Sequence, residues 1–295
     1  MTEDGPRPDE SAGWFENVAP DDPEAGAARI REGRADAPED WPARAVEAGV
    51  AEDEDEYYAE LRRASLTAAR EAAAERERAT DQQVVHAVRA MDDAASEANE
   101  LAERVAEWAG SRYPDAGTGV DYARKLAASE PESATDEQLV SLAERVAGLA
   151  DESEALREFV ERETPAVAPN LAAMAGPVLA ARLISLAGGL DSLAKMPSGT
   201  VQVLGAEDSL FAHLRGRAPS PKHGVIFTHE FVRGTHPDER GSAARTLAGK
   251  LTLAARVDNY SGERKPELDE ELQRRMDRIR GRTNDDAGES GGDGE

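Results

Sequence analysis

The sequence predicts a mainly α protein, in which a long antiparallel coiled-coil hairpin precedes a compact all-α domain. Two apolar stripes at helical spacing, between residues 81 and 165, predict the hairpin. Short apolar runs separated by Gly and Pro, between residues 166 and 281, predict the compact domain. Only Gly224 to Phe227 has a strand-like composition there, and one strand cannot form a sheet.

The first 80 residues read as a separate acidic region. They are rich in Pro, Gly, Asp and Glu, and Trp14, Phe15 and Trp41 are among their few large apolar side chains. Such a composition buries too little apolar surface to offset the entropy of ordering the chain. We therefore expect residues 1–80 to form a reduced, partly disordered domain. Its aromatic side chains would anchor it to a folded partner. The alternative is a disordered extension whose aromatic side chains contact nothing.

The first helix of the hairpin belongs to a helical segment from Tyr57 to Trp108. After Asp81, apolar residues recur at alternating spacings of four and three, which is the period of one helix face. The stripe consists of Val84, Val88, Met91, Ala95, Ala98, Ala102 and Val105, with Leu101 and Trp108 beside it.

The second helix is predicted to begin at Thr135, whose hydroxyl would form a capping box with Gln138, and to end at Pro165. A short polar segment joins the two helices. The second stripe consists of Leu139, Leu142, Val146, Leu149, Leu156 and Val160.

The hairpin seam is half alanine, so we expect apolar surface to remain for a second copy of the chain. The alternative is that the stripes are covered within one chain, which would leave a monomer. The residues predicted to mediate dimerisation are Val84, Val88, Met91, Leu101, Val105, Leu142, Val146, Leu149 and Leu156.

The compact domain is expected to contain buried helices within Leu171 to Leu190, Val201 to Leu214 and Ser242 to Val257. Pro266 to Arg280 would form a charged terminal helix. Residues 282–295 are a low-complexity acidic tail and are expected to be disordered.

The amino-acid composition indicates a halophilic protein and excludes sites that depend on cysteine. The 295 residues include 60 acidic and 35 basic side chains, for a net charge of −25, and only five of the basic residues are Lys. This bias is typical of an extreme halophile, in which concentrated salt screens the self-repulsion. The absence of Cys excludes disulfides and thiolate zinc sites. No long apolar run or signal peptide is visible, so a cytoplasmic location is expected.

The charge is unevenly distributed along the chain. Residues 1–165 carry a net charge of −24, whereas residues 166–282 carry +4. A basic segment inside so acidic a chain indicates contact with phosphate groups. The alternative is a chance lack of carboxylates.

The sequence contains parts of three catalytic motifs, and each lacks a residue or a companion motif that its chemistry requires. Gly249-Lys250 is followed by Leu251, so the hydroxyl of a phosphate-binding loop is missing. His229-Glu230 begins like a zinc-protease motif, but Arg233 stands where the second His is needed. Ser192 and Lys195 have the spacing of a serine acylase without that family's companion motifs. We expect no active site, no metal and no cofactor.

Residues 168–263 resemble the Nop domain, which archaeal and nucleolar box C/D ribonucleoprotein core proteins share with a splicing factor. The matching segments are Ala168-Pro169-Asn170-Leu171, Ala181 to Ser185, Gly188-Gly189-Leu190 with Leu193-Ala194-Lys195, Val203 to Glu207, Leu210-Phe211, Pro221-Lys222 with Gly224 and Ile226, and Leu251 to Asp258. Upstream, Asp92-Asp93, Asn99 to Trp108 and Tyr113-Pro114 resemble the family's first coiled-coil helix.

The resemblance implies a scaffold without chemistry of its own. In this family the Nop domain binds kink-turn guide RNA together with a ribosomal-type protein, the coiled coil pairs two scaffolds, and an amino-terminal domain holds the methyltransferase fibrillarin. The assembled particle directs 2′-O-methylation of ribosomal or transfer RNA. The family's usual Lys and Arg are replaced here by Asp208 and Ala212, and Arg215 and Arg217 are expected to take over their contacts.

Together, the resemblance and the local positive charge imply a set of RNA- and particle-binding residues. These are Lys195, Gly205, Ala206, Glu207, Phe211, Arg215, Arg217, Lys222, His223, Arg245, Lys250 and Arg256. Two other functions stay open from the sequence. One is a dimeric helical scaffold for protein interactions that does not bind RNA, and the other is a Nop protein of the splicing or transfer-RNA type.

Overall fold

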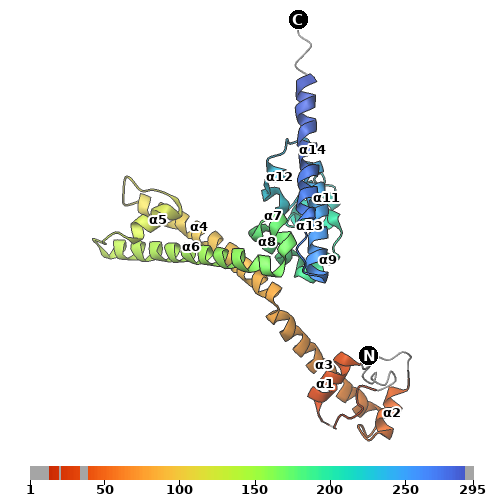
Figure 1. Ribbon diagram of the computed structural model, residues 1–295. Coiled ribbons are helices and arrows are strands. Elements are labelled where there is room, and N and C mark those ends of the chain that lie inside the picture. Colours follow the sequence, from red (N-terminus) through yellow and green to blue (C-terminus); the bar gives the residue numbers. More distant parts are fainter. Residues whose placement is uncertain (1–12, 20, 34–38, 290–295) are drawn as a thin grey trace. The chain divides into compact units, whose positions relative to one another are not determined.

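The computed structural model describes residues 13–19, 21–33 and 39–289, with side chains as far as Gly281. Within these ranges the chain forms helices joined by turns and no strand, which confirms the mainly α prediction. The fold divides into two compact units, Met1–Ala79 and Thr80–Glu295 (Figure 1).

The amino-terminal unit contains three helices: α1 (Pro23–Glu32), α2 (Trp41–Glu47) and α3 (Glu54–Arg78). An aspartate precedes each helix, and its carboxylate accepts a hydrogen bond from a backbone N–H of the first turn. Acidic residues therefore start these helices, although they contribute nothing to a core. The three caps are Asp22, Asp40 and Asp53.

An aromatic cluster forms the core of this unit. The Phe15 side chain is 1% exposed, and its ring centroid lies 6.0, 6.2 and 6.5 Å from those of Trp14, Tyr57 and Trp41. The Trp14 indole nitrogen also donates to the Tyr57 hydroxyl at 3.3 Å. The expectation that Phe15 is free to anchor a partner was wrong, because its ring is buried, whereas Trp14 and Trp41 pack on it and stay partly exposed. The expected disorder of this region concerns residues 1–12 in part, and these lie outside the described ranges.

The hairpin is built from α4 (Thr80–Gly110) and α6 (Ala134–Val167), which pack along most of their length (Figure 1). The predicted short polar connection is wrong. A further helix, α5 (Gly119–Ala127), lies in the connection and packs on both long helices through Ala123 and Leu126. A lone helical hairpin would leave its tip open, and α5 covers it.

Both ends predicted for α6 differ from the structure. The helix is capped by Ser133, whose hydroxyl accepts from the backbone N–H of Asp136 at 3.2 Å and donates to its carboxylate at 2.7 Å. This capping pair lies two residues before Thr135. Pro165 does not stop the helix, which continues to Val167. So close to the carboxyl end, a proline removes only one hydrogen bond of the helix.

The residues predicted to pair two chains are largely buried within one. Val84, Val88 and Met91 are at most 1% exposed and pack with Val160 and with Ala181 of the compact domain. Nearer the tip, Val105 and Val146 are fully buried under α5. Only Leu101, Leu142, Leu149 and Leu156 stay partly exposed. The alternative of stripes covered within the chain is therefore correct for the buried positions.

The compact domain consists of eight α-helices and one 3₁₀ helix among the described residues. They are α7 (Pro169–Ala175), α8 (Pro177–Ala187), α9 (Leu190–Lys195), α10 (Ser198–Val203), α11 (Glu207–Leu214), η1 (Val225–Thr228), α12 (Glu230–Arg233), α13 (Arg240–Tyr260) and α14 (Glu267–Glu289). Their shared core includes Leu171, Leu183, Ile184, Ile226, Leu247 and Leu251.

Three predicted segments of this domain need correction. Val201 to Leu214 is two helices, because Gly205 between them adopts a φ of +78°, which ends α10. The strand-like Gly224 to Phe227 leads into the 3₁₀ helix η1. The terminal helix α14 continues past Arg280 to Glu289, so much of the predicted disordered tail has a helical backbone. Residues 290–295 lie outside the described ranges.

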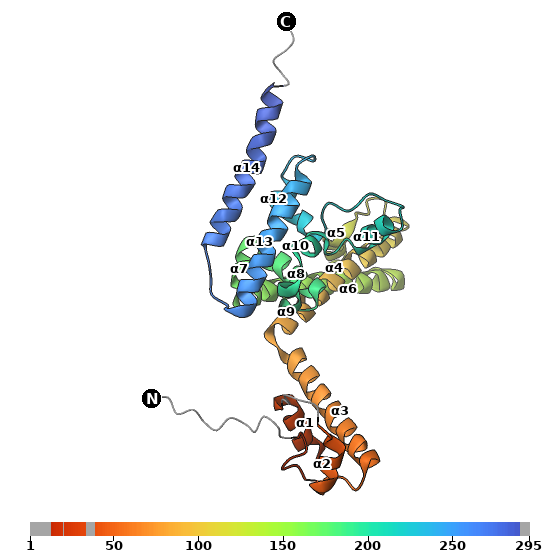
Figure 2. The same ribbon diagram turned by 90° about the vertical axis from the view of Figure 1, so that its right-hand side faces the viewer.

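The terminal helices α13 and α14 run in opposite directions and pack together (Figure 2). Leu268, Leu272, Met276 and Ile279 of α14 are buried in the shared core. The Lys250 ammonium of α13 also lies 2.5 Å from the Glu271 carboxylate of α14.

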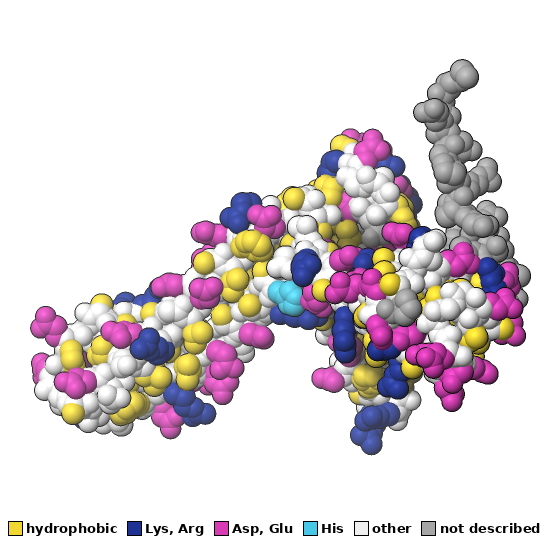
Figure 3. Space-filling model, turned by 90° about the horizontal axis from the view of Figure 1, so that it is seen from below, with side chains coloured by type: hydrophobic (Ala, Val, Ile, Leu, Met, Phe, Trp, Pro, Cys, Tyr) yellow, Lys and Arg dark blue, Asp and Glu magenta, His cyan; other side chains and the backbone are white. Residues whose placement is uncertain are grey.

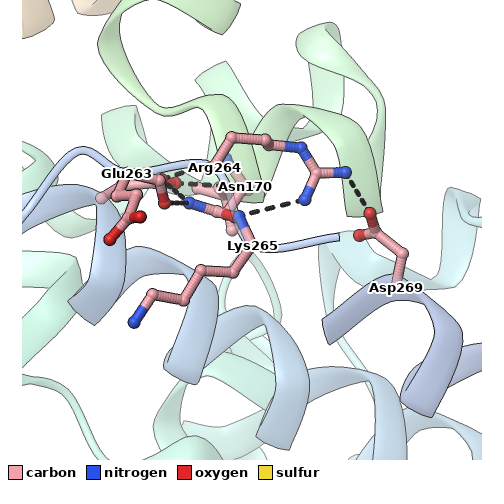
Figure 4. A network of polar contacts seen from close by, with 7 residues as sticks. Asn170, Glu263, Arg264, Lys265 and Asp269 are labelled. Carbon is pink, nitrogen blue, oxygen red and sulfur yellow. Dashed lines mark hydrogen bonds and ion pairs between the residues drawn. The ribbon is translucent and has the colours of Figure 1, made fainter. Parts of the chain in front are cut away.

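A buried polar network joins the two ends of the compact domain. Asp258, near the end of α13, accepts three hydrogen bonds of 2.7–3.0 Å from Asn170 N, Asn170 Nδ2 and Leu171 N at the start of α7. The Asn170 amide donates in turn to the Glu263 carbonyl at 2.8 Å, and its oxygen accepts from Lys265 N at 2.6 Å and from Arg264 (Figure 4). The network therefore fixes both α7 and the loop that leads to α14.

A second polar contact holds the hairpin to the compact domain. The Arg182 guanidinium of α8 pairs with the Asp92 carboxylate of α4 through both of its oxygens. Arg89 of α4 donates to the hydroxyl and the carbonyl of Ser185 at 3.0 and 3.2 Å. Because these bonds join α4 directly to α8, the base of the hairpin is part of the domain's packing.

Among the described residues, no single helix is long and apolar enough to cross a membrane. The bent pair α7 and α8, which meet at 118°, reaches that length and composition only when the two are counted together.

The hairpin tip should show a distinct dependence on pH. Hydrogen bonds from Tyr113 and Ser133, with the Arg112 guanidinium beside them, lower the pKa of Asp136 to about 2. An unfolded Asp titrates at about 3.9, so the Asp136 carboxylate stabilises the fold above that pH and loses this effect as the pH falls towards 2. We expect urea unfolding to show Asp136→Asn less stable than the wild type at neutral pH, with the difference shrinking below pH ~4. A difference that is constant with pH would contradict this assignment.

Candidate nucleic-acid interface

The candidate interface is a loop pinned to the end of α10. Gly224 N donates to the Gln202 carbonyl at 2.9 Å, and Val225 N donates to the Leu204 carbonyl at 2.7 Å. The Gln202 side chain closes the loop by donating to the Lys222 carbonyl at 2.7 Å. A Cβ atom at residue 224 would collide with the Leu204 carbonyl, so only glycine allows this approach. The backbone of Lys222 and His223 is thereby held in place.

A stacked arrangement of rings and a cation lies beside this loop. The His223 and Phe227 rings stack at 4.5 Å, and the Arg240 guanidinium lies 5.4 Å from the Phe227 ring centroid. Burial lowers the pKa of His223 below its ordinary value, and the charges of Arg240 and Lys222 lower it further. The imidazole is therefore neutral at pH 7, and the arginine and lysine supply the positive charge.

Helix α11 adds an exposed apolar surface next to basic residues. Phe211 is 55% exposed and Leu214 is 70% exposed, so core packing does not account for either side chain. Arg215 and Arg217 follow directly and are exposed. At the other end of the helix, the Glu207 carboxylate accepts from Gly205 N at 2.8 Å and steadies the turn that includes Ala206. An aromatic ring can stack on a base, a leucine can contact a protein surface, and arginines can pair with phosphates, so these residues together suit a junction of RNA and protein.

The remaining predicted residues lie outside this group or are engaged elsewhere. Lys195 of α9 is exposed and pairs with Asp191 at 2.7 Å. Arg245 and Arg256 are exposed on α13, and Arg256 donates to the Ala194 carbonyl at 3.0 Å. Arg245 is therefore available to a phosphate, whereas Lys195 and Arg256 would first have to give up an interaction within the domain.

Lys250 was predicted as an RNA contact, and its position contradicts that role. Its side chain is 8% exposed, and its ammonium is directed at Glu271 of α14. This hydrogen bond from Lys250 lowers the pKa of the Glu271 carboxyl. Lys250 therefore joins α13 to α14 inside the domain.

Sequence reasoning missed three members of the site. Arg240 comes from the first turn of α13, Leu214 from the end of α11, and Gln202 from α10. Only Arg240 carried a signal, since it is a basic residue in the basic segment. Leu214 reads as an ordinary core residue in a helical pattern, and the role of Gln202 depends on a loop twenty residues away.

A family model and several similar proteins all indicate the same family. The family model described as "Nop: snoRNA binding domain, fibrillarin" matches residues 120–279. A NOP5 family protein of Methanocaldococcus jannaschii is 42% identical over 165 residues, which cover 56% of this chain and 40% of that protein. Nucleolar protein 58 of Schizosaccharomyces pombe is 33% identical over 218 residues, covering 61% of this chain and 43% of its own length. This chain thus spans about two fifths of the length of these relatives.

A crystal structure of a fibrillarin/Nop5p complex contains a chain of similar fold. The TM-score is 0.51 at 24% sequence identity, and the alignment covers 86% of this chain and 92% of the other. At this level of identity the likeness concerns the fold.

Substitution of Lys250 tests its structural role. Lys250→Ala removes one of the two cations that pair with Glu271, leaving Arg275 at 2.7 Å. It should lower the free energy of unfolding by about 1–2 kcal/mol, less than the loss of a fully buried pair because Glu271 is partly exposed. Lys222→Ala, at an exposed position, should change it by less than about 0.5 kcal/mol. Urea unfolding followed by circular dichroism measures both. Equal effects of the two substitutions would argue against the buried role of Lys250.

Proposed function

Because the chain belongs to the Nop family, we propose that it is a non-catalytic scaffold of a box C/D small ribonucleoprotein. In this role it binds kink-turn guide RNA and recruits fibrillarin for RNA-guided 2′-O-methylation of ribosomal or transfer RNA. The family match covers most of α5, all of α6 and nearly all of the compact domain, and the family is described by snoRNA binding and by fibrillarin.

The observation that carries this proposal is the exposed basic and aromatic surface in an otherwise acidic chain. Lys222, Arg217 and Arg245 are exposed on the domain with a net positive charge, and the Gly224 contact holds the loop of Lys222 in place. A rigid loop loses little entropy when it contacts a phosphate. The described part of the chain contains no grouping of His, Asp or Glu suited to a metal ion.

The ribosomal-type kink-turn protein is proposed to contact α11. Phe211 and Leu214 are exposed beside Arg215 and Arg217, so a protein surface and an RNA backbone can be bound together there. Fibrillarin is proposed to bind the amino-terminal unit. The described residues of that unit form a small helical domain with its own aromatic core, which can present a fixed surface.

Two copies of the chain are proposed to pair through the hairpin. On the face shown in Figure 3, hydrophobic side chains lie along the hairpin between interspersed acidic and basic groups. Trp108 is 37% exposed and Leu149 is partly exposed, whereas the buried seam between the helices is already occupied. The pairing surface is therefore the outer side of the hairpin.

RNA binding is tested by sequencing the RNA that co-purifies with the tagged chain and by titration with a C/D-type RNA. We expect Lys222→Ala and Arg245→Ala each to weaken binding of different guide RNAs by a similar factor. Each should also reduce the slope of log affinity against log salt by about 1, as expected for the loss of one phosphate contact.

Two outcomes would decide against this function. If the wild-type chain retains no C/D-type RNA, the protein is a helical interaction scaffold without RNA binding. If it retains RNA of a spliceosomal type or transfer RNA alone, it belongs to another kind of Nop particle. Lys195→Ala is the control for the loss of one positive charge. It should weaken RNA binding less than Lys222→Ala does, because Lys195 is already paired with Asp191.

Self-association is tested by sedimentation of hairpin variants. Trp108→Glu combined with Leu149→Glu should give monomers at molar salt while the helical content stays unchanged, because both side chains reach the surface. Val88→Asp should instead lower the thermal stability, since a buried charge without a partner is costly. A wild-type chain that sediments as a monomer would rule out the pairing.

A further inference from the structure

One face of α3 in the amino-terminal unit carries no carboxylate between Tyr58 and Ala73. Ala59, Arg62, Leu66, Ala69 and Ala73 recur at spacings of three and four and so share one side of the helix, with Tyr58 and Ser65 at its margin. All seven residues are exposed. This α3 face extends for about four turns of helix. It lies in a region, residues 1–79, that contains 22 acidic and 10 basic side chains.

The acidic residues of this stretch lie elsewhere on the helix and are engaged. Between Tyr57 and Arg76 they are Glu60, Glu71 and Glu75. Glu60 is buried and pairs with Arg63, while Glu71 and Glu75 both pair with Arg31 of α1. These three carboxylates thus hold the unit together on one side, and on the other side the only carboxylates of α3 at this spacing, Asp55 and Glu77, lie at its two ends.

The α3 face is also unusually apolar for an exposed helix. Tyr58 is 51% exposed and Leu66 is 46% exposed, whereas Tyr57, Ala64 and Ala68 on the inner side are buried. The inner side packs on α1 and α2, and Tyr58 on the outer side also makes an edge contact with the ring of Tyr57, at 5.2 Å between centroids. Two turns apart on one helix, Tyr58 and Leu66 resemble the anchors with which an amphipathic helix binds a partner.

The arginines on this side have no carboxylate near them. In the described part of the chain no ion pair joins Arg62 or Arg70 to an acidic residue, although the neighbouring Arg63 pairs with both Asp21 and Glu60. An unpaired arginine in so acidic a unit is available to carboxylates of another molecule.

We propose that the α3 face, centred on Tyr58, Arg62 and Leu66, is the docking surface for fibrillarin. This inference rests on the proposed function and specifies the surface that the function requires. The occupant presents apolar side chains to Tyr58 and Leu66 and carboxylates to Arg62 and Arg70. The aromatic residues Trp14, Phe15 and Trp41 act indirectly, because their cluster supports α3 from within the unit.

Two other occupants fit the charges less well. In a second copy packed antiparallel about Leu66, Arg62 would lie beside Arg70 of the other chain, and in a parallel pair each arginine would meet itself. Either arrangement brings like charges together without a carboxylate between them. RNA would meet the two arginines but also the many carboxylates of the unit, and it offers nothing apolar for Leu66. An acidic protein surface satisfies both the charge and the apolar contacts.

The test uses the full-length chain and its cognate fibrillarin, mixed at molar salt and measured by calorimetry. Tyr58→Ala combined with Leu66→Asp should raise the Kd by about 30-fold or more, the size expected when anchor residues are lost. Arg62→Glu should raise the Kd by about tenfold, with a smaller effect at higher salt. Val46→Asp is the matched control, because Val46 is an apolar side chain of α2 that is 39% exposed.

The controls separate the possible failures. Circular dichroism should show the same helical content in all variants, and titration with C/D-type RNA should give wild-type affinity. If the α3 variants bind fibrillarin as the wild type does, the α3 face is not the docking surface and the scaffold function stands. If the wild-type chain binds RNA but no fibrillarin, both the recruitment and this surface are rejected. If Leu66→Asp abolishes self-association and leaves fibrillarin bound, a second copy occupies the face.

Discussion

The hydrogen bonds from Asn170 and Leu171 to the buried Asp258 carboxylate hold the compact domain together. Asp258 is 6% exposed and Asn170 is fully buried. A carboxylate out of water is costly unless donors replace its hydration, and here three N–H groups of α7 do so. The same asparagine then orders the loop at Glu263 and Lys265, so the position of α14 depends on it. The start of α7, the end of α13 and the beginning of α14 form one assembly for this reason.

The rest of the molecule distributes charge around this core. Carboxylates start the helices of the amino-terminal unit, tie α4 to α8 through Asp92 and Arg182, and fix the hairpin tip through Asp136. They are scarce at two exposed places, the loop and helix around Lys222 and Arg217 and the outer face of α3. In an acidic chain such places are where a partner with negative charge can approach without repulsion. Both proposed binding surfaces are thus exposed places where carboxylates are scarce.

Similarity to known proteins and physical reasoning support different parts of the account. The family match covers residues 120–279, from α5 to most of the described side chains of α14. The amino-terminal unit lies outside the family match, and its small aromatic core allows three helices to present a fixed surface. The buried side chains of Phe15 and Tyr57 hold that surface in place, and the exposed side chains of Tyr58 and Leu66 give it apolar area that a partner can cover.

The sequence by itself determined the helical fold, the two long stripes of the hairpin and the basic character of the compact domain. Each of these depends on local periodicity or on summed charge, which a linear chain displays directly. Only the tertiary structure decided what covers each stripe. Val88 faces Ala181 rather than a second chain, Lys250 meets Glu271 twenty-one residues later, and Trp14 packs on Tyr57. A stripe of apolar residues demands burial without specifying a partner, and a lysine can suit a phosphate or a carboxylate equally well. The choice is made by contacts between residues far apart in the chain, which local pattern does not encode.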